Sequence, residues 1–457
     1  MRNSILGGVT AALLLTTLTA QAADEAAGSV RYMSGTLVAQ KADGTLRVLR
    51  PKSEVHPGEL LVTGEKSYAQ VTMNDGTKMT LRPQSNLKIE AYQFKSEEPK
   101  ADNAVFRLLK GGFRTVTGLI GKRGNPDAYS LRAAGATIGI RGTDFSSRLC
   151  ATKGCADDEA VKPAAAAPAL KAVGRVMRVQ GALAAKEADG KIRKLTLGSP
   201  VFEGDTLQSD AASYAVVAFR DGGRITLQEK SVFQVEAFKY DKAQGQENVA
   251  LRLIKGGVRV VTGLIGRVNR DNYKFRMSGA TIGIRGTGFD AWCNGHCAEG
   301  AADFGANPEN PLDGAGVYVW AGEVLLVGPG GSYTVAINQA AIIARKTGKP
   351  VRILTIPAAI EKNDAPRPDS VPVDIEKLFE EVESSGDAGL YVMVHDGHVI
   401  VAKGDQQIDL GKGESGFSND QILARLAETP GFMQDDRLEN LEQYDDSGEN
   451  QNGCVIR

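Results

Sequence analysis

The nine residues GATIGIRGT occupy positions 135–143, and the same nine letters return at positions 279–287. Two identical nonamers at a spacing of 144 residues (279 − 135) indicate a duplicated module. Within the first copy, Ile138 and Ile140 alternate with small or polar residues, which is typical of a strand. Gly142 then permits a tight bend. We interpret the nonamer as the closing strand and bend of each module.

The sequence before each nonamer is duplicated as well. Three matched pairs of segments are Gly28-Ser29-Val30 with Gly174-Arg175-Val176, Asp75-Gly76 with Asp221-Gly222, and Leu109-Lys110-Gly111-Gly112 with Ile254-Lys255-Gly256-Gly257. The offset drifts from 146 to 144 residues, as two single-residue deletions in loops would produce. Around the Asp-Gly pairs, apolar residues alternate with polar ones, which predicts β-hairpins. Both copies lack helical periodicity, so we predict an all-β fold for each.

Composition agrees with this fold class and limits the partners. The chain has 53 glycines and only 6% aromatic residues, which favours short strands joined by glycine turns. Its formal net charge is −1, so no bulk field draws it to nucleic acid or to an anionic membrane. We therefore expect no nucleic-acid partner.

The N-terminus reads as a targeting segment. Arg2 precedes an apolar run over 5–20, and Ala20-Gln21-Ala22 is a cleavage signal. We predict a signal peptide over 1–22 and no transmembrane segment after its removal, since no later apolar run has the length of a span. The alternative is a membrane anchor. The expected location is the periplasm, with the protein either free or held peripherally at the outer membrane.

The predicted organisation divides the chain into seven parts. These are the signal peptide at 1–22, a first β domain at 28–150, an Ala/Pro linker at 156–172, a second β domain at 173–298, a short β unit at 312–358, a helix with a second short β unit at 370–434, and an acidic disordered tail at 435–457. The helix is predicted from Ile375, Leu378, Phe379 and Val382, which fall at helical spacing behind Asp374, a candidate N-cap.

Cysteines follow each nonamer in close pairs. Cys150 and Cys155 form one pair, Cys293 and Cys297 form the other, and Cys454 is left over. In an oxidising compartment we expect two short-range disulfides, each stabilising by about 2 kcal/mol. Pairing between the copies stays open, because sequence does not fix connectivity.

Metal binding is the alternative for the histidines and cysteines. His296 lies inside the second cysteine pair, but not in the order of a haem attachment motif. His395 and His398 flank Asp396-Gly397 and would face each other across a hairpin. Two imidazoles are too few for a metal site, so we interpret them as an exposed turn and predict no metal and no cofactor.

Three features carry a resemblance to a known family: the hairpin, the Lys-Gly-Gly segment that leads into a strand, and the closing bend. These residues are Tyr68-Ala69, Asp75-Gly76-Thr77, Lys110-Gly111-Gly112 and Ile140-Arg141-Gly142-Thr143-Asp144-Phe145, matched by Ser213-Tyr214-Ala215, Asp221-Gly222-Gly223, Gly256-Gly257 and Ile284-Arg285-Gly286-Thr287-Gly288-Phe289. Over 28–145 and 174–289 the chain resembles the FecR domain family. The resemblance implies two extracytoplasmic modules built as a β-solenoid or twisted β-stack. In this chain we expect short C-terminal β clusters and one amphipathic helix in addition to the two modules.

The founding members of that family are transmembrane regulators that relay a siderophore signal from an outer-membrane transporter to a sigma factor. This chain shows no cytoplasmic segment before its apolar run, so the resemblance does not extend to sigma-factor regulation. It implies a periplasmic β module used for interaction.

Two residue sets are candidates for ligand binding. Arg141 and Arg285 lie among glycines and could bind a carboxylate or phosphate, although we favour a role in holding the bend. The aromatic residues that could stack on sugars are Tyr32, Tyr68, Tyr214, Tyr318, Tyr391 and Trp320. Such residues also suit half-buried strands, which we favour.

The sequence holds no G-x-S-x-G, H-E-x-x-H or P-loop motif. We therefore predict that the protein is not an enzyme. Our first hypothesis is a periplasmic, signal-related module that binds an envelope protein or outer-membrane receptor through tandem domains. The alternative is a peptidoglycan or glycan binder.

Overall fold

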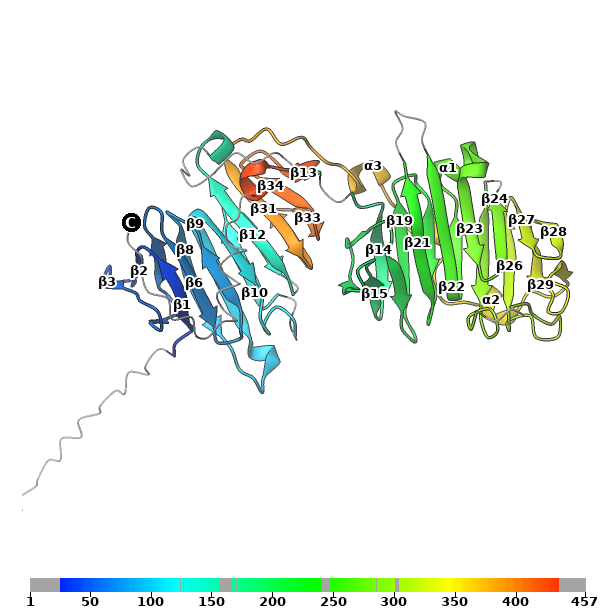
Figure 1. The fold of residues 1–457 in the computed structure, drawn as a ribbon, viewed down its shortest axis with the longest axis horizontal. Coiled ribbons are helices and arrows are strands. Elements are labelled where there is room, and N and C mark those ends of the chain that lie inside the picture. The colour runs from blue at the N-terminus through cyan, green and yellow to red at the C-terminus, as the bar shows by residue number, and fades with distance from the viewer. Residues whose placement is uncertain are drawn as a thin grey trace, which may run out of the picture.

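The computed structural model describes residues 25–123, 125, 127–140, 142–155, 167–168, 171–240, 247–284, 286–300 and 304–434. The predicted signal peptide, the tail at 435–457 and most of the linker lie outside these ranges, as do Arg141 and Arg285. The chain forms two elongated β stacks that lie one after the other along the long axis (Figure 1). We call them the first and second repeat.

The first repeat consists of two layers, sheets A1 and B1. Sheet A1 contains, in spatial order, β4 (Glu54–Val55), β1 (Gly28–Ser34), β6 (Tyr68–Met73), β7 (Lys78–Leu81), β9 (Asn103–Val116), β12 (Asp144–Cys150), β31 (Gly389–Asp396), β34 (Ser415–Ser418) and β35 (Leu423–Leu426). Sheet B1 contains β3 (Leu46–Val48), β2 (Leu37–Gln40), β5 (Leu60–Thr63), β8 (Asn86–Gln93), β9, β10 (Tyr129–Ala133), β11 (Ala136–Ile140), β32 (His398–Lys403) and β33 (Gln406–Gly411).

The second repeat has the same two layers, A2 and B2. Sheet A2 contains β17 (Pro200–Val201), β14 (Gly174–Gln180), β19 (Tyr214–Phe219), β20 (Arg224–Leu227), β22 (Asn248–Val261), β25 (Gly288–Cys293), β26 (Ala315–Ala321), β29 (Gln339–Ile343) and β30 (Pro350–Ile353). Sheet B2 contains β16 (Ile192–Leu195), β15 (Leu183–Lys186), β18 (Thr206–Ser209), β21 (Val232–Lys239), β22, β23 (Tyr273–Met277), β24 (Ala280–Ile284), β27 (Glu323–Gly328) and β28 (Gly331–Ala336).

Helices are few and short among the described residues. They are α1 (Leu264–Val268), α2 (Ala358–Glu361), α3 (Ile375–Leu378) and α4 (Gly431–Gln434), with 3-10 turns at η1 (Pro99–Ala101), η2 (Lys153–Cys155), η3 (Arg270–Asn272) and η4 (Pro368–Ser370). β13 (Ala167–Pro168) pairs with β36 (Glu428–Thr429). The prediction of an all-β chain with two tandem modules is confirmed.

The predicted amphipathic helix begins where expected but is shorter. The Asp374 carboxylate accepts a hydrogen bond from the Lys377 amide at 3.1 Å, and α3 ends at Leu378. Val382, predicted to continue the helix, instead forms a bridge with Leu426. Pairing with a strand thus ends a helix that periodicity alone would extend.

The Lys-Gly-Gly motif explains how one strand serves both layers. The first half of β9 pairs in sheet B1 and its second half in A1. The crossing falls at Gly111, which has a φ of +73°. A Cβ there would lie 2.4 Å from the Ser85 hydroxyl, so the bend requires glycine. Gly256 makes the same crossing in β22, with a φ of +87°.

Each repeat is completed by strands that follow the nonamer. β26–β30 extend the second repeat directly. The chain then returns, and β31–β35 extend the first repeat, where the Thr143 hydroxyl donates to the His398 carbonyl 255 residues along the chain. Figure 1 shows these orange and red strands beside the cyan ones. The nonamer strands, β11 and β24, therefore pair with a strand on each side. They are not the last strands of their sheets, because the short C-terminal β units, which we predicted to be separate, add further strands to both repeats.

Two apolar cores result, one inside each stack. Leu390, Val392, Val394, Val399 and Val401 from the returning strands are buried in the core of the first repeat. The second repeat has its own continuous core. The returning strands are therefore part of the hydrophobic interior of the first repeat and do not merely cover its surface.

Candidate functional site

Each closing bend is held by a reciprocal pair of threonines. The Thr117 amide donates to the Thr143 carbonyl at 3.0 Å, and the Thr143 amide donates to the Thr117 hydroxyl at 2.8 Å. Thr262 and Thr287 repeat both bonds at 3.1 and 2.9 Å. The bend is therefore fixed in both repeats. Arg141 and Arg285, the candidate ligand-binding residues, stand beside it but outside the described residues, so their role remains a prediction.

Beside each bend lies a short loop of sequence TGLIG, at 117–121 and 262–266, which we call the leucine loop. In the first repeat a buried aspartate fixes it. The Asp75 carbonyl accepts from the Leu119 amide at 2.9 Å, and its carboxylate accepts from the Ile120 amide at 3.1 Å. A Cβ on Gly118 would lie 2.3 Å from that carbonyl, so only glycine lets the loop approach.

The second repeat builds its leucine loop in the same way. The Asp221 carbonyl accepts from the Leu264 amide at 2.8 Å, and Asp221 is 2% exposed. Burial raises the pKa of its carboxyl above the ordinary range, against backbone hydrogen bonds that lower it. The Asp-Gly hairpin predicted from sequence thus also anchors a neighbouring loop.

The leucine loops present an apolar side chain to solvent at matching positions. Leu119 is 48% exposed and Leu264 is 47% exposed. In the first repeat the loop borders an open hollow of about 900 Å³, lined also by Lys78, Lys122 and Asp144. Each repeat thus exposes one leucine on a backbone that hydrogen bonds to a buried aspartate hold in place.

The two repeats differ at one buried position of sheet A2. Asp290 in β25 occupies the position that Ser146 has in β12, and it is 3% exposed. Its carboxylate lies 3.6 Å from the Arg259 guanidinium and accepts from the Trp320 indole at 3.2 Å. Burial raises the pKa of Asp290 to about 6, and the charge of Arg259 offsets only part of that shift.

We expect Asp290 to make the second repeat less stable as the pH rises. Its folded pKa of about 6 lies above the unfolded value of 3.8, so the folded state binds the proton more tightly. Stability then falls between about pH 4 and pH 6, by about 2 to 3 kcal/mol, and stays lower above that range. Asp290→Asn should remove this component and be more stable than wild type at pH 8.

Urea unfolding followed by tryptophan fluorescence at pH 5 and pH 8 measures the effect, since both tryptophans, Trp292 and Trp320, lie in the second repeat. Other groups titrate in the same pH range. The quantity to compare is therefore the change in the free energy of unfolding between pH 5 and pH 8, in wild type and in Asp290→Asn. An Asp290→Asn variant with the wild-type pH slope would contradict the assignment.

The cysteines pair within each repeat. Cys150 bonds to Cys155, and Cys293 bonds to Cys297, with Cα–Cα distances of 4.8 and 5.1 Å. Both disulfides follow the strand after the nonamer. They fix the chain where it leaves that strand, as the short spacing predicts. Cys454 lies outside the described residues.

The two histidines near Gly397 do not face each other. His395 is the second-last residue of β31 in sheet A1, whereas His398 begins β32 in sheet B1. The His395 ring lies 2.8 Å from the Ser146 hydroxyl, and the His398 ring lies 2.6 Å from Asp409. The predicted exposed hairpin is wrong, because the chain crosses between layers here. In the described ranges, groups of three or more His, Cys, Asp or Glu suited to a metal ion do not occur.

The aromatic candidates do not form one platform. Tyr391 is 1% exposed and packs against Phe417 with tilted rings and against Phe432 edge to face. The Arg367 guanidinium lies 4.4 Å from the centre of the Trp320 ring. Tyr32 remains 40% exposed. These rings are spread over both repeats, which agrees with packing roles on half-buried strands.

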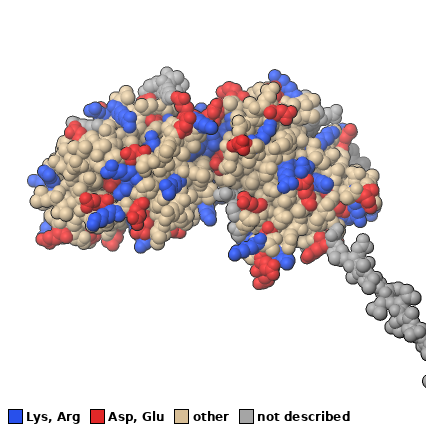
Figure 2. All heavy atoms as spheres, turned by 180° about the vertical axis from the view of Figure 1, so that it is seen from behind, with Lys and Arg blue, Asp and Glu red and all other residues tan. Residues whose placement is uncertain are grey.

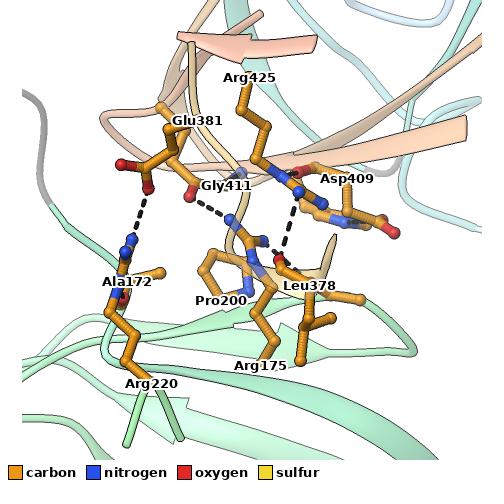
Figure 3. A network of polar contacts seen from close by, with 12 residues as sticks. Ala172, Arg175, Pro200, Arg220, Leu378, Glu381, Asp409, Gly411 and Arg425 are labelled. Carbon is orange, nitrogen blue, oxygen red and sulfur yellow. Dashed lines mark hydrogen bonds and ion pairs between the residues drawn. The ribbon is translucent and has the colours of Figure 1, made fainter. Parts of the chain in front are cut away.

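The junction between the repeats was not predicted from the sequence. There the turn between β33 and β34 meets the start of the second repeat (Figure 3). The fully buried Arg175 guanidinium bonds the Glu414 carboxylate at 2.5 Å, and Arg220 pairs with Glu381. Burial lowers the pKa of the nearby Arg425 to about 10, and the charge of Arg175 adds to that shift.

Further contacts close the junction at its edges. Lys412 bonds Glu187 at 2.6 Å, and Lys191 pairs with Asp396. The Gly411 backbone also packs closely against the Pro200 side chain, because a Cβ on Gly411 would lie 2.1 Å from the ring of Pro200. Between the repeats a cleft of about 570 Å³ remains. The junction is therefore both ionic and sterically matched.

Residues that differ between equivalent positions of the two repeats are the sequence signal from which the junction could have been predicted. Arg175 and Arg220 replace Ser29 and Asn74 of the first repeat at the 146-residue offset. On the opposite surface, Glu414 takes the place that Gln339 has in the second repeat. At these positions a charged side chain replaces a neutral one on each of the two surfaces that meet. An alignment of the two repeats, searched for positions where one has a charged residue and the other a neutral one, would have identified these junction residues.

The fold and its bends define a class of protein, a tandem β module. Residues 59–157 and 205–302 match the model of the family described as FecR protein. One match lies in each repeat, so the chain contains two FecR regions in tandem. FecR domains are envelope-associated, signal-related regulatory modules and are generally non-enzymatic. No curated protein matches the chain.

Three solved structures show limited likeness. A cell surface anchoring domain is 26% identical, with a TM-score of 0.13, and the match covers 13% of this chain and 80% of that one. Two structures of a candidate anti-sigma factor from Parabacteroides distasonis ATCC 8503 also match. The one at 2.50 Å is 14% identical, with a TM-score of 0.23 and coverage of 32% and 58%. The one at 1.65 Å is 11% identical, with a TM-score of 0.25 and coverage of 45% and 99%.

Within the described part of the chain, no helix has the length and apolar character needed to cross a bilayer. On the face seen in Figure 2, charges of both signs are interspersed over both repeats. This distribution agrees with the net charge of −1.

Proposed function

We propose that this protein is a non-enzymatic, signal-related interaction module of the periplasm. In this proposal its two FecR domains bind an envelope protein or outer-membrane receptor through the two leucine loops. The observation that carries the proposal is the matched exposure of Leu119 and Leu264, at 48% and 47%, on loops that buried aspartates hold in place.

Fixed loops favour binding for an energetic reason. A loop already held by hydrogen bonds loses little conformational freedom when a partner docks. Gly118 and Thr77 add to this rigidity, since the Gly118 amide donates to the Thr77 hydroxyl at 2.8 Å. An apolar side chain on such a loop can enter a pocket of the partner at low entropic cost.

Duplication strengthens the effect. The ionic junction joins the repeats directly, so both leucine loops belong to one connected unit. When one loop has bound, the second meets the partner at a high effective concentration. A partner with two matching sites, or a dimeric partner, is therefore favoured over one with a single site.

The test is capture of partners from envelope extract by the immobilised protein. Each of Leu119→Asp and Leu264→Asp should lower recovery of the partner about tenfold, as loss of one interface anchor does, and the double variant should abolish it. Leu354→Asp is the matched control, because Leu354 is 93% exposed but lies away from both loops.

Equal recovery by wild type and the double variant would refute the proposal. Co-sedimentation with purified sacculi distinguishes the alternative function. Binding to sacculi that both leucine substitutions leave unchanged would favour a peptidoglycan or glycan binder instead.

A further inference from the structure

The hollow beside the first leucine loop has a counterpart in the second repeat. Residues of β7, β9 and β12 line the hollow, and the corresponding strands of the second repeat are β20, β22 and β25. The strand pairings place Arg224 where the first repeat has Lys78, and Gly288 where it has Asp144. The two sites can therefore be compared residue by residue.

In the second repeat a later segment of the chain fills this site. Residues 362–374, which we call the strap, lead from α2 to α3, and the η4 turn within them lies against β20 and β22. The Arg224 guanidinium donates to the carbonyls of Pro368 and Val371, at 3.4 and 2.9 Å. The strap is thus held through main-chain carbonyls, which every extended segment presents.

The strap is rich in proline and extended where it binds. Pro366, Pro368 and Pro372 follow one another closely, and Pro368 is buried. Arg367, between the first two, has a φ of −63° and a ψ of 137°. These angles are close to those of a polyproline II helix, a conformation that proline favours before any partner is present. Such a segment loses little conformational freedom when it binds.

The first repeat carries no such cover within the ranges that the structure describes. In the second repeat Trp320 packs over Gly288, where a Cβ would lie 2.2 Å from the indole ring, and the Arg367 guanidinium lies 4.4 Å from the ring centre. His395 takes the place of Trp320 in the first repeat, and its ring lies 2.8 Å from the Ser146 hydroxyl. A hollow of about 900 Å³ remains there.

Three side chains at the hollow define the chemistry of a segment that would fill it. Leu119 is 48% exposed and offers an apolar surface to a proline ring. Lys122 is exposed and follows the first leucine loop as Arg267 follows the second, so a carboxylate on the segment would pair with it. Lys78 has three ammonium donors, and a main-chain carbonyl needs one of them, as in the bond that Arg224 makes.

We propose that the hollow of the first repeat binds an extended, proline-rich segment of a partner protein, with an acidic residue of that segment at Lys122. The strap shows the mode of binding, and the partner supplies in trans what the second repeat receives in cis. The inference rests on the proposed function, because it names the kind of segment that the first leucine loop receives.

A fluorescein-labelled synthetic peptide with the sequence of residues 362–374 tests the proposal by fluorescence anisotropy. We expect saturable binding to the wild-type chain, because its own strap is already bound to the second repeat. Leu119→Asp and Lys122→Glu should each weaken the binding about tenfold, as loss of an interface anchor does. Arg267→Glu and Leu354→Asp are the matched controls and should leave the affinity unchanged.

A second peptide isolates the contribution of the prolines. In this peptide alanine replaces the residues that correspond to Pro366, Pro368 and Pro372. It keeps every charge but must be ordered on binding, so it should bind about tenfold more weakly. Equal affinity of the two peptides would show that the hollow does not select a proline-rich segment.

The remaining outcomes would each overturn the proposal. Absence of saturable binding, or equal binding to wild type and Leu119→Asp, would show that the hollow does not receive such a segment. If the peptide binds only after the acidic residues of 435–457 are changed to Asn or Gln, the chain itself fills the hollow. If sedimentation detects a wild-type dimer that Lys122→Glu lacks, the occupant is a second copy. Capture from envelope extract that still depends on Leu119 would leave the proposed function standing in each case.

Discussion

Val399→Asp is expected to unfold the first repeat while the second stays folded. Val399 lies in β32, pairs with Ile140 of β11 and is fully buried in the core of the first repeat. An uncompensated carboxylate there should cost about 4 kcal/mol or more, a large part of the 5–15 kcal/mol that holds a domain together.

Val324→Asp is the matched variant of the second repeat. Val324 is also fully buried, and it pairs with Ile284 of β24 as Val399 pairs with Ile140. It should unfold the second repeat and quench the native fluorescence of Trp292 and Trp320. In Val399→Asp that fluorescence should persist while part of the far-UV dichroism is lost.

Hydrogen exchange resolved by mass spectrometry locates the change. Amides of β9, β11 and β12 should lose protection in Val399→Asp, and those of β22, β24 and β25 should keep it. Protection of β11 and β12 that survives while β31–β34 open would mean that the C-terminal strands are a separate unit.

Much of the fold could be predicted because its signals are local. The alternating residues around Asp75-Gly76 predict the β6–β7 hairpin, and the spacing of the cysteines predicts both disulfides. The identical nonamers predict two copies of one module. Each of these features is decided within a few residues of chain, where turn chemistry and side-chain alternation dominate.

The partner of β31 could not be predicted in this way. Both C-terminal strand clusters read alike, and nothing within either says which repeat it extends. That choice depends on complementary surfaces far apart in sequence, such as Arg175 with Glu414. Local propensity carries no information about such pairs. The fixed backbone of the leucine loop could not be predicted for a related reason, because the carboxylate of Asp75, which is remote in sequence, holds it in place.

Breaking the buried ion pair at the junction is expected to be nearly as damaging. Arg175 is fully buried and the Glu414 side chain is 7% exposed. Glu414→Ala leaves the guanidinium buried without its carboxylate and close to Arg425, so it should destabilise the protein by about 3 to 5 kcal/mol. The exposed pair of Arg132 with Glu90, 49% and 20% exposed, is the control, and Arg132→Ala should cost at most about 1 kcal/mol.

The combined variant Arg175→Met with Glu414→Leu separates charge from packing. Replacing both partners by apolar side chains of similar size removes the uncompensated charge, so most of the lost stability should return. The remaining loss is the hydrogen bond that the Gly411 amide donates to the Glu414 carboxylate at 2.8 Å. Urea unfolding followed by dichroism and by tryptophan fluorescence gives the free energies, and small-angle scattering reports whether the repeats stay together. A single variant Glu414→Ala no less stable than the control would show that the pair does not hold the junction. In that case the close contact of Gly411 with Pro200 would have to hold the junction, because there the backbone of one repeat packs directly on a side-chain ring of the other.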